Sequence, residues 1–146
     1  MDQKALDFMK DKRLALIGVS RTSHKFGNAI HKDLSEMGYE IIPVHPEMDE
    51  VNGKKCLPSI SAIEGEIDGL IINVSKDRVG SILEEAAEAG IKKVWLQQGS
   101  SNDDLVKKGE ELGLDIVKGK CVFMYAREVG SIHKFHRWIW KLIGQY

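Results

Sequence analysis

Groups that could bind phosphate gather in one short segment, residues 18–28. Gly18 permits a backbone turn where a Cβ would obstruct a ligand, and Gly27 with Asn28 opens a predicted helix whose free N–H groups attract anions. Arg21 and Lys25 add positive charge to this segment. Hydroxyl groups come from Ser20, Thr22 and Ser23. This concentration favours a phosphate-binding loop over an ordinary polar connection.

The spacing of these glycines departs from the two commonest nucleotide motifs. Gly18 and Gly27 have no glycine between them, unlike GxGxxG, and no glycine directly precedes Lys25 as it would in a P-loop. An NAD site usually also places an acid after the second strand, to bind the ribose diol. Here that position reads Val44-His45-Pro46, with no carboxylate until Glu47. Orthodox NAD binding is therefore disfavoured, whereas a ribose bearing a 3′-phosphate, as in coenzyme A, tolerates the missing acid.

Other candidates for chemistry are weaker. Cys121 follows the last predicted strand, where its thiol could exchange with a ligand thiol, although a lone cysteine there is more often a small buried hydrophobe. His133 and His136 share one face of a predicted helix without an evident third ligand, so we expect no metal site. The sequence contains no GxSxG elbow. We expect no catalytic residues, and an enzyme is the less favoured interpretation.

The elements that position these residues alternate along the chain. Apolar runs predict strands over residues 13–19, 39–44, 68–74, 93–97 and 114–117. Helical patterns cover about residues 2–9, 27–37, 75–90, 101–113 and 129–144. Ser75 and Ser101 are the predicted N-caps of the third and fourth helices, and Pro43 with Pro46 is expected to close the second strand. Residues 47–67 are irregular, with a short strand around residues 55–57 or a small helix.

This alternation predicts an α/β fold. βαβ units with right-handed crossovers give a mainly parallel five-stranded sheet with helices on both faces, which is a doubly wound, Rossmann-like domain. The 146 residues are expected to form one such domain, residues 1–146, with its core over about residues 13–124. In these sheets ligands bind at the carboxyl ends of the strands, at the point where the strand order reverses.

Composition limits the classes of partner. The chain is 42% hydrophobic and 29% charged, with a net charge of −1. This balance gives no general attraction to nucleic acid or to an acidic membrane, and no apolar run is long enough to span one. Two cysteines are too few for a disulfide scaffold, and the N-terminus lacks the pattern of a signal peptide. We expect a cytoplasmic protein that binds neither nucleic acid nor membrane.

Four motifs in order carry a resemblance to a known family. They are Ala15-Leu-Ile-Gly-Val-Ser20, Lys25-Phe-Gly-Asn28, Gly38-Tyr39 with Ile42-Pro-Val-His-Pro46, and Val94-Trp-Leu-Gln-Gln-Gly99. Over about residues 13–124 the chain resembles the small CoA-binding proteins related to the CoA-binding domain of the succinyl-CoA synthetase alpha subunit. His45 stands where that family usually has Asn, and Val122 follows Cys121 where the family often has Pro.

The resemblance implies a coenzyme A site along the strand ends. The loop after the first strand would meet the pyrophosphate or the 3′-phosphate, the second strand end would border the adenosine, and the fourth strand end would lie toward the pantetheine. The implied ligand-binding residues are Gly18, Val19, Ser20, Lys25, Phe26, Gly27, Pro43, Val44, His45, Pro46, Asn73, Val74, Ser75, Arg78, Gln97, Gly99 and Cys121.

Three functions remain open. The favoured one is a carrier, sensor or regulatory module that binds coenzyme A or an acyl-CoA without catalysis. The alternatives are a small NAD(P)-dependent oxidoreductase or CoA-dependent transferase, and a ligand-free interaction protein acting through the C-terminal helix. That helix, over about residues 129–144, is basic, aromatic and amphipathic, which suits packing on the domain or on a second subunit in a homodimer.

Overall fold

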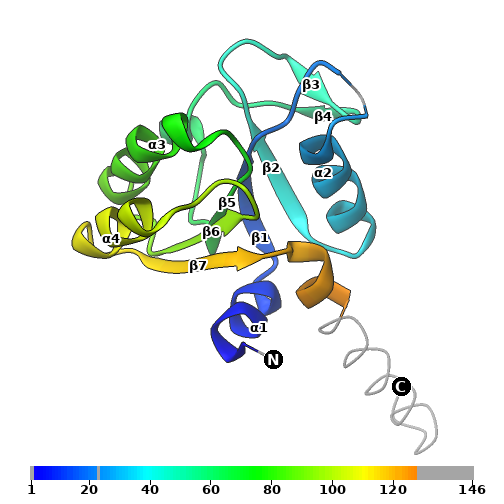
Figure 1. The fold of residues 1–146 in the computed structure, drawn as a ribbon. Coiled ribbons are helices and arrows are strands. Elements are labelled where there is room, and N and C mark those ends of the chain that lie inside the picture. Colours follow the sequence, from blue (N-terminus) through cyan, green and yellow to red (C-terminus); the bar gives the residue numbers. More distant parts are fainter. Residues whose placement is uncertain (1, 23, 128–146) are drawn as a thin grey trace, which may run out of the picture.

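The computed structural model describes residues 2–22 and 24–127. Residues 122–127 are helical. The other elements are α1 (Gln3–Lys10), β1 (Arg13–Ile17), α2 (Phe26–Glu36), β2 (Glu40–Val44), β3 (Glu50–Val51), β4 (Lys54–Lys55), the 3₁₀ turn η1 (Ile60–Ala62), β5 (Gly69–Ile72), α3 (Lys76–Glu88), β6 (Lys93–Gln97), α4 (Asp103–Glu111) and β7 (Asp115–Lys120). Figure 1 shows the sheet between two groups of helices.

The main sheet is parallel, and its strand order reverses beside β1. Five strands lie in the order β2-β1-β5-β6-β7, and each pair of neighbours is parallel. The chain passes from β1 outward to β2, then returns past β1 to β5 and continues to β7. The carboxyl ends of β1, β2 and β5 therefore meet at the switch point, where open α/β sheets bind ligands. The predicted doubly wound α/β fold is confirmed.

Alternate residues of the strands face two helical layers. Leu14 and Leu16 of β1 join the core beneath α1, α2 and residues 122–127, whereas Ala15 and Ile17 join the core beneath α3 and α4. Because both faces are covered, the central strands are apolar on both sides, and this explains the continuous apolar runs in the sequence.

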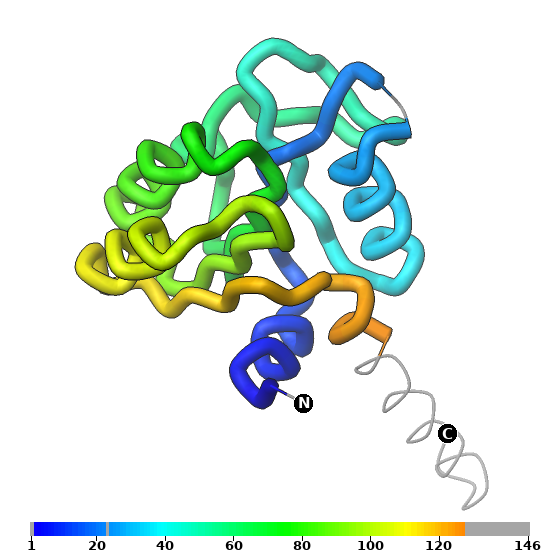
Figure 2. Tube along the Cα trace, in the orientation of Figure 1, coloured from blue at the N-terminus to red at the C-terminus, as the bar shows by residue number. Residues whose placement is uncertain are grey.

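Trp95 of β6 joins the two ends of the described chain. Its side chain is fully buried, and its ring meets the rings of Phe8 in α1 and Tyr125 after β7, with centroids 5.4 and 5.7 Å apart. Figure 2 shows α1 and this last helical turn at the same end of the molecule. The aromatic contacts therefore fix the chain that leaves β7 on the face that α1 covers.

Two local predictions differ from the structure, whereas the irregular segment contains both a short strand and a small helical turn, the two predicted alternatives. Pro43 lies inside β2, opposite Leu16, and does not end the strand. β2 is an edge strand, where the missing N–H of proline is tolerated. Asn102, and not Ser101, caps α4, because its Oδ1 accepts a hydrogen bond of 2.8 Å from the Leu105 amide. The irregular segment holds an antiparallel hairpin of β3 and β4 followed by η1.

The helix predicted over about residues 129–144 lies outside the described residues. Within residues 2–22 and 24–127, no helix has the length and apolar character needed to cross a membrane.

Candidate functional site

The loop after β1 is packed directly against the start of α2 and the end of β5. A Cβ on Gly27 would lie 1.9 Å from the Gly18 carbonyl oxygen, and a Cβ on Gly18 would lie 2.3 Å from the Asn73 carbonyl oxygen. Gly18 also has a φ of +138°, which side chains rarely adopt. Both glycines are therefore required by the protein's own backbone, whereas the sequence argument for Gly18 rested on clearance for a ligand.

Asn28 holds this loop in one conformation. Its side chain is buried, its Oδ1 accepts from the Ser20 amide at 2.7 Å, and its Nδ2 donates to the Ser20 carbonyl at 2.8 Å. A longer contact of 3.4 Å joins Nδ2 to the Thr22 carbonyl. The sequence indicated Asn28 only as part of a helix start, and its position directly after Gly27 was the available signal.

Two helices that begin at the carboxyl edge have no side-chain cap. Lys25 precedes α2 and Ser75 precedes α3, and neither side chain accepts a hydrogen bond from its helix. In contrast, Asp2 caps α1 and Asn102 caps α4 through their side chains. The first N–H groups of α2 and α3 can therefore serve an anionic ligand, and the dipole of each helix favours negative charge there.

A cleft of about 380 Å³ opens at the switch point. Its walls come from the ends of β1 and β2, the start of α3 and the segment before η1. Seven residues predicted from the sequence line it: Gly18, Val19, Val44, His45, Pro46, Val74 and Arg78. Asp77 and Glu85 of α3 also line it, as do Pro58 and Ser59. Sequence reasoning missed Pro58 and Ser59 because they lie in the irregular segment, which has no periodicity.

His45 is oriented by backbone donors. Its Nδ1 accepts from the amides of Glu47 at 3.0 Å and Met48 at 3.1 Å. Partial burial is the main cause that lowers the pKa of His45 below its usual value, and the nearby positive charge of Arg21 lowers it further. The ring is therefore neutral at pH 7 with its proton on Nε2, which can donate a hydrogen bond to a ligand in the cleft.

Gln97 braces the segment that follows β7. Its side chain is 1% exposed, and its Oε1 accepts from Trp95 Nε1 at 3.1 Å and from the Val122 amide at 3.2 Å. Its Nε2 donates to Cys121 Sγ at 3.4 Å. The carboxamide is thus used within the protein, whereas the resemblance implied that Gln97 would lie toward the pantetheine. Cys121 is partly exposed at the end of β7.

The other ten predicted residues do not line this cleft. Pro43 is buried within β2, Lys25 and Ser75 are exposed at the starts of α2 and α3, and Gly99 lies in an exposed turn after β6. Ser100 ties this turn to β5, because its Oγ accepts from the Val74 amide at 3.1 Å and donates to the Val74 carbonyl at 2.7 Å.

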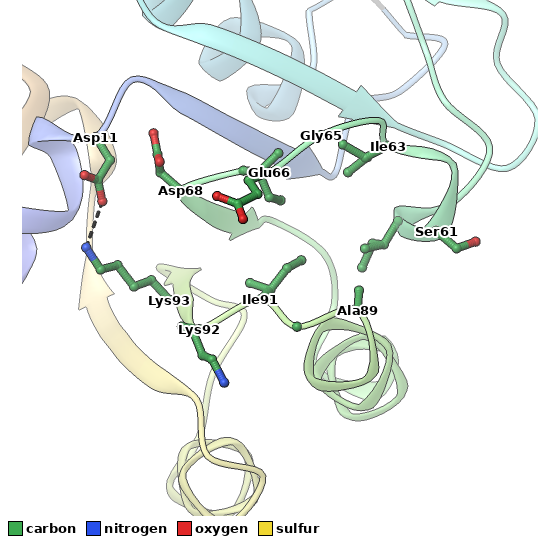
Figure 3. A pocket seen from close by; sticks show the side chains of 13 residues that line it. Asp11, Ser61, Ile63, Gly65, Glu66, Asp68, Ala89, Ile91, Lys92 and Lys93 are labelled. Carbon is green, nitrogen blue, oxygen red and sulfur yellow. Dashed lines mark hydrogen bonds and ion pairs between the residues drawn. The ribbon is translucent and has the colours of Figure 1, made fainter.

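A larger cleft of about 720 Å³ lies at the opposite, amino edge of the sheet. Figure 3 shows Asp11 paired with Lys93, at 2.9 Å, with Glu66 and Asp68 from the segment before β5. The end of α3, at Ala89, also lines this cleft and carries the negative end of the helix dipole. These carboxylates and the helix end disfavour phosphate, although two lysines lie beside them.

The described residues contain no group of three or more His, Cys, Asp or Glu side chains that could hold a metal ion. Figure 1 places the ends of β1 and β5 close to the starts of α2 and α3, and the described phosphate-friendly groups of the loop after β1 lie at this edge.

A family model described as a CoA binding domain matches residues 12–127. This chain belongs to the CoA-binding domain family. The uncharacterized protein YneT of Bacillus subtilis is 32% identical to it over 115 residues, which are 77% of this chain and 84% of YneT. A hypothetical protein from Pyrococcus horikoshii has a solved structure with a TM-score of 0.81 and 32% identity, covering 88% of this chain and 92% of that one. The resemblance seen in the four motifs is therefore confirmed.

Larger relatives contain the domain as one part. An ADP-forming acetate–CoA ligase of Methanocaldococcus jannaschii is 40% identical over 81 residues, which are 56% of this chain and only 12% of the ligase. This chain therefore matches a small fraction of that enzyme.

Proposed function

We propose that this CoA-binding domain protein binds coenzyme A or an acyl-CoA at the carboxyl edge of its sheet, as a carrier, sensor or regulatory module. The observation that carries the proposal is the cleft at the switch point, lined by Gly18, His45 and Arg78 and flanked by two helix starts without side-chain caps. The family match supports the same ligand class.

The adenosine occupies the cleft between the end of β2 and the start of α3. Pro46 borders one side, Arg78 the other, and His45 Nε2 donates a hydrogen bond to the sugar or the base. The pyrophosphate lies against the loop after β1 and the start of α2, where Lys25 and the free helix amides neutralise its charge. The pantetheine arm then runs along the ends of β5 and β6 toward Cys121 at the end of β7.

The charges near β2 favour coenzyme A over NAD. Glu47 is the first carboxylate after β2, and it is paired with Arg21 at 3.0 Å. An acid engaged in this way is less available to a ribose diol, and Arg78 in the cleft lining suits a phosphorylated ribose.

Calorimetry with a panel of ligands tests the proposal. CoA, dephospho-CoA, NAD, NADP and ATP are titrated into the full chain, and CoA is expected to bind more tightly than NAD and dephospho-CoA. Equal binding of NAD would favour the oxidoreductase alternative. Failure of every CoA compound to bind would overturn the proposal.

Lys25→Ala identifies the edge that binds the phosphates. It is expected to weaken CoA binding by about 1–3 kcal/mol, as when a charged hydrogen bond is lost. Lys92→Ala is the matched control, because Lys92 is also exposed and lines the amino-edge cleft. An unchanged affinity for Lys25→Ala, or an equal loss for both variants, would place the phosphates elsewhere.

A further inference from the structure

An aromatic contact joins the loop after β1 to the segment after β7. Phe26, the first residue of α2, meets Phe123 with ring centroids 5.5 Å apart and an interplanar angle of 83°. In the sheet β1 and β7 are separated by β5 and β6. The two rings therefore connect loops from well-separated strands at the carboxyl edge, on the face covered by α1 and α2.

Exposed apolar side chains occur at both sides of this contact. Phe26 is 46% exposed, and Met124, which follows Phe123, is 55% exposed. Among the described residues only two other large hydrophobic side chains are exposed, Met37 and Leu112, and both follow the last residue of a helix. We call Phe26, Phe123 and Met124 the apolar platform.

The platform adjoins the two ends of the proposed ligand path. Phe26 directly follows Lys25, which the proposal places at the phosphates, and Phe123 lies two residues after Cys121, toward which the pantetheine arm runs. The thiol end of coenzyme A would thus approach an apolar surface next to the end of β7. An unacylated thiol gains little from this surface, whereas an alkyl chain bonded to it as a thioester gains by leaving water.

We infer that the apolar platform binds the alkyl chain of an acyl-CoA, so that the preferred ligand is a thioester of several carbons rather than free coenzyme A. This inference rests on the proposed function, because the same site must hold the CoA moiety. The acyl chain lies across the exposed Phe26 ring and the Met124 side chain, and Phe123 supports Phe26 from beneath.

The test measures affinity as a function of chain length. CoA, acetyl-CoA, butyryl-CoA and octanoyl-CoA are titrated calorimetrically into the full chain, and the ratio of the CoA to the octanoyl-CoA dissociation constant is the readout. Full burial of one methylene is worth about a fourfold change in affinity, so an open platform is expected to give a ratio of roughly tenfold or more. A ratio near one would overturn the inference while leaving the proposed function intact. Absence of CoA binding would instead overturn the proposed function, and the inference with it.

Substitutions locate the effect. Phe26→Ser and Met124→Ser are each expected to lower the ratio several-fold. Met37→Ser is the matched control, because Met37 is 41% exposed and lies just beyond the other end of α2, and its ratio should equal that of the wild type. Because both dissociation constants are measured for the same variant, their ratio is unaffected by any change in how that variant binds the CoA moiety.

Light scattering distinguishes another occupant of the platform. If octanoyl-CoA preference survives in Phe26→Ser and Met124→Ser while the molecular mass falls from that of a dimer to that of a monomer, the platform is a contact between two copies and the inference is wrong. A mass unchanged by the substitutions, together with a lost preference, supports the acyl site.

Discussion

The clefts at the two edges of the sheet differ in the helix ends that lie beside them. The amino-edge cleft has about 720 Å³ and is lined by carboxylates, two lysines and the end of α3, whereas the carboxyl-edge cleft has about 380 Å³ and is lined by Arg78, the carboxylates Asp77 and Glu85, and a glycine loop. The smaller cleft nevertheless suits a nucleotide better, because uncapped helix starts and a glycine loop beside it offer free N–H groups to phosphate. Volume alone would select the wrong edge.

The difference follows from the direction of the chain. In a parallel sheet every crossover helix starts at the carboxyl edge and ends at the amino edge, so the positive ends of the helix dipoles collect at the first and the negative ends at the second. The sequence adds to this bias by leaving α2 and α3 without side-chain caps beside the cleft. Comparing equivalent residues at the two edges therefore separates folding from binding.

Two glycines at opposite edges should give the largest contrast. Gly27→Ala would place a Cβ 1.9 Å from the Gly18 carbonyl oxygen, so we expect a loss of about 3 kcal/mol in the free energy of unfolding, as for severe overpacking, and loss of CoA binding. Gly90→Ala, at the amino edge, meets no atom within 4 Å and bears only its φ of +81°. It should cost about 1 kcal/mol and leave CoA affinity unchanged.

Chemical denaturation and calorimetry on both glycine variants check this prediction. The denaturation midpoint should fall further for Gly27→Ala than for Gly90→Ala. An equal effect of the two variants on CoA affinity would contradict the assignment of the ligand to the carboxyl edge.

The side chains that hydrogen-bond the loops at the two edges should give a second, smaller difference between the edges. Asn28 holds the carboxyl-edge loop through Ser20, and Arg13 holds the amino-edge segment by donating to the carbonyls of Glu64, at 2.9 Å, and Glu66. Asn28→Ala should destabilise the fold by about 2 kcal/mol, since buried partners lose their hydrogen bonds, and should also weaken CoA binding. Arg13→Gln should lower stability without changing CoA affinity.

Chemical denaturation and calorimetry check this prediction as well, and the change in CoA affinity decides between the outcomes. If Asn28→Ala loses stability but retains wild-type CoA affinity, the loop conformation does not contribute to binding.

The sequence predicted the parts of the site that depend on strand ends. Runs such as 13–17, 41–44 and 69–72 are apolar because both sheet faces are covered. Their ends, and Gly18, His45 and Val74 after them, were therefore predictable. The direction of a side chain was harder to predict from the sequence. Gln97 follows the same rule of position, yet its carboxamide turns inward to Trp95 and Cys121.

The sequence did not predict the residues that line a cleft from segments without regular secondary structure. Pro58 and Ser59 reach the cleft through the hairpin β3–β4 and the bridge between Val44 and Leu57, a path that no periodic pattern records. The amino-edge cleft was missed for a related reason, because it depends on how the segment before β5 packs beside the end of α3. Tertiary contacts of this kind are set by packing and not by local preference.

Protonation of His31 and His45 should produce the smallest effect. Burial lowers the pKa of His31, which lies on α2 with its Nδ1 3.1 Å from the Asn52 side-chain nitrogen, and the pKa of His45 is also lowered. Both groups bind protons more weakly in the folded chain than in the unfolded chain, whose histidines titrate near 6.5. Their contribution to stability is therefore complete above about pH 6.5 and is lost as the pH falls below it.

Thermal unfolding between pH 7.5 and pH 5.5 should show Tm falling toward the acid end, in a range above the titration of ordinary carboxyl groups. His31→Asn and His45→Asn retain an acceptor near the position of Nδ1 but do not titrate, so each should flatten the slope. The residues that line the amino-edge cleft include no histidine, and Asp11→Asn there should leave the slope between these pH values unchanged. A slope that persists in the double histidine variant would assign the pH dependence to other groups and contradict this prediction.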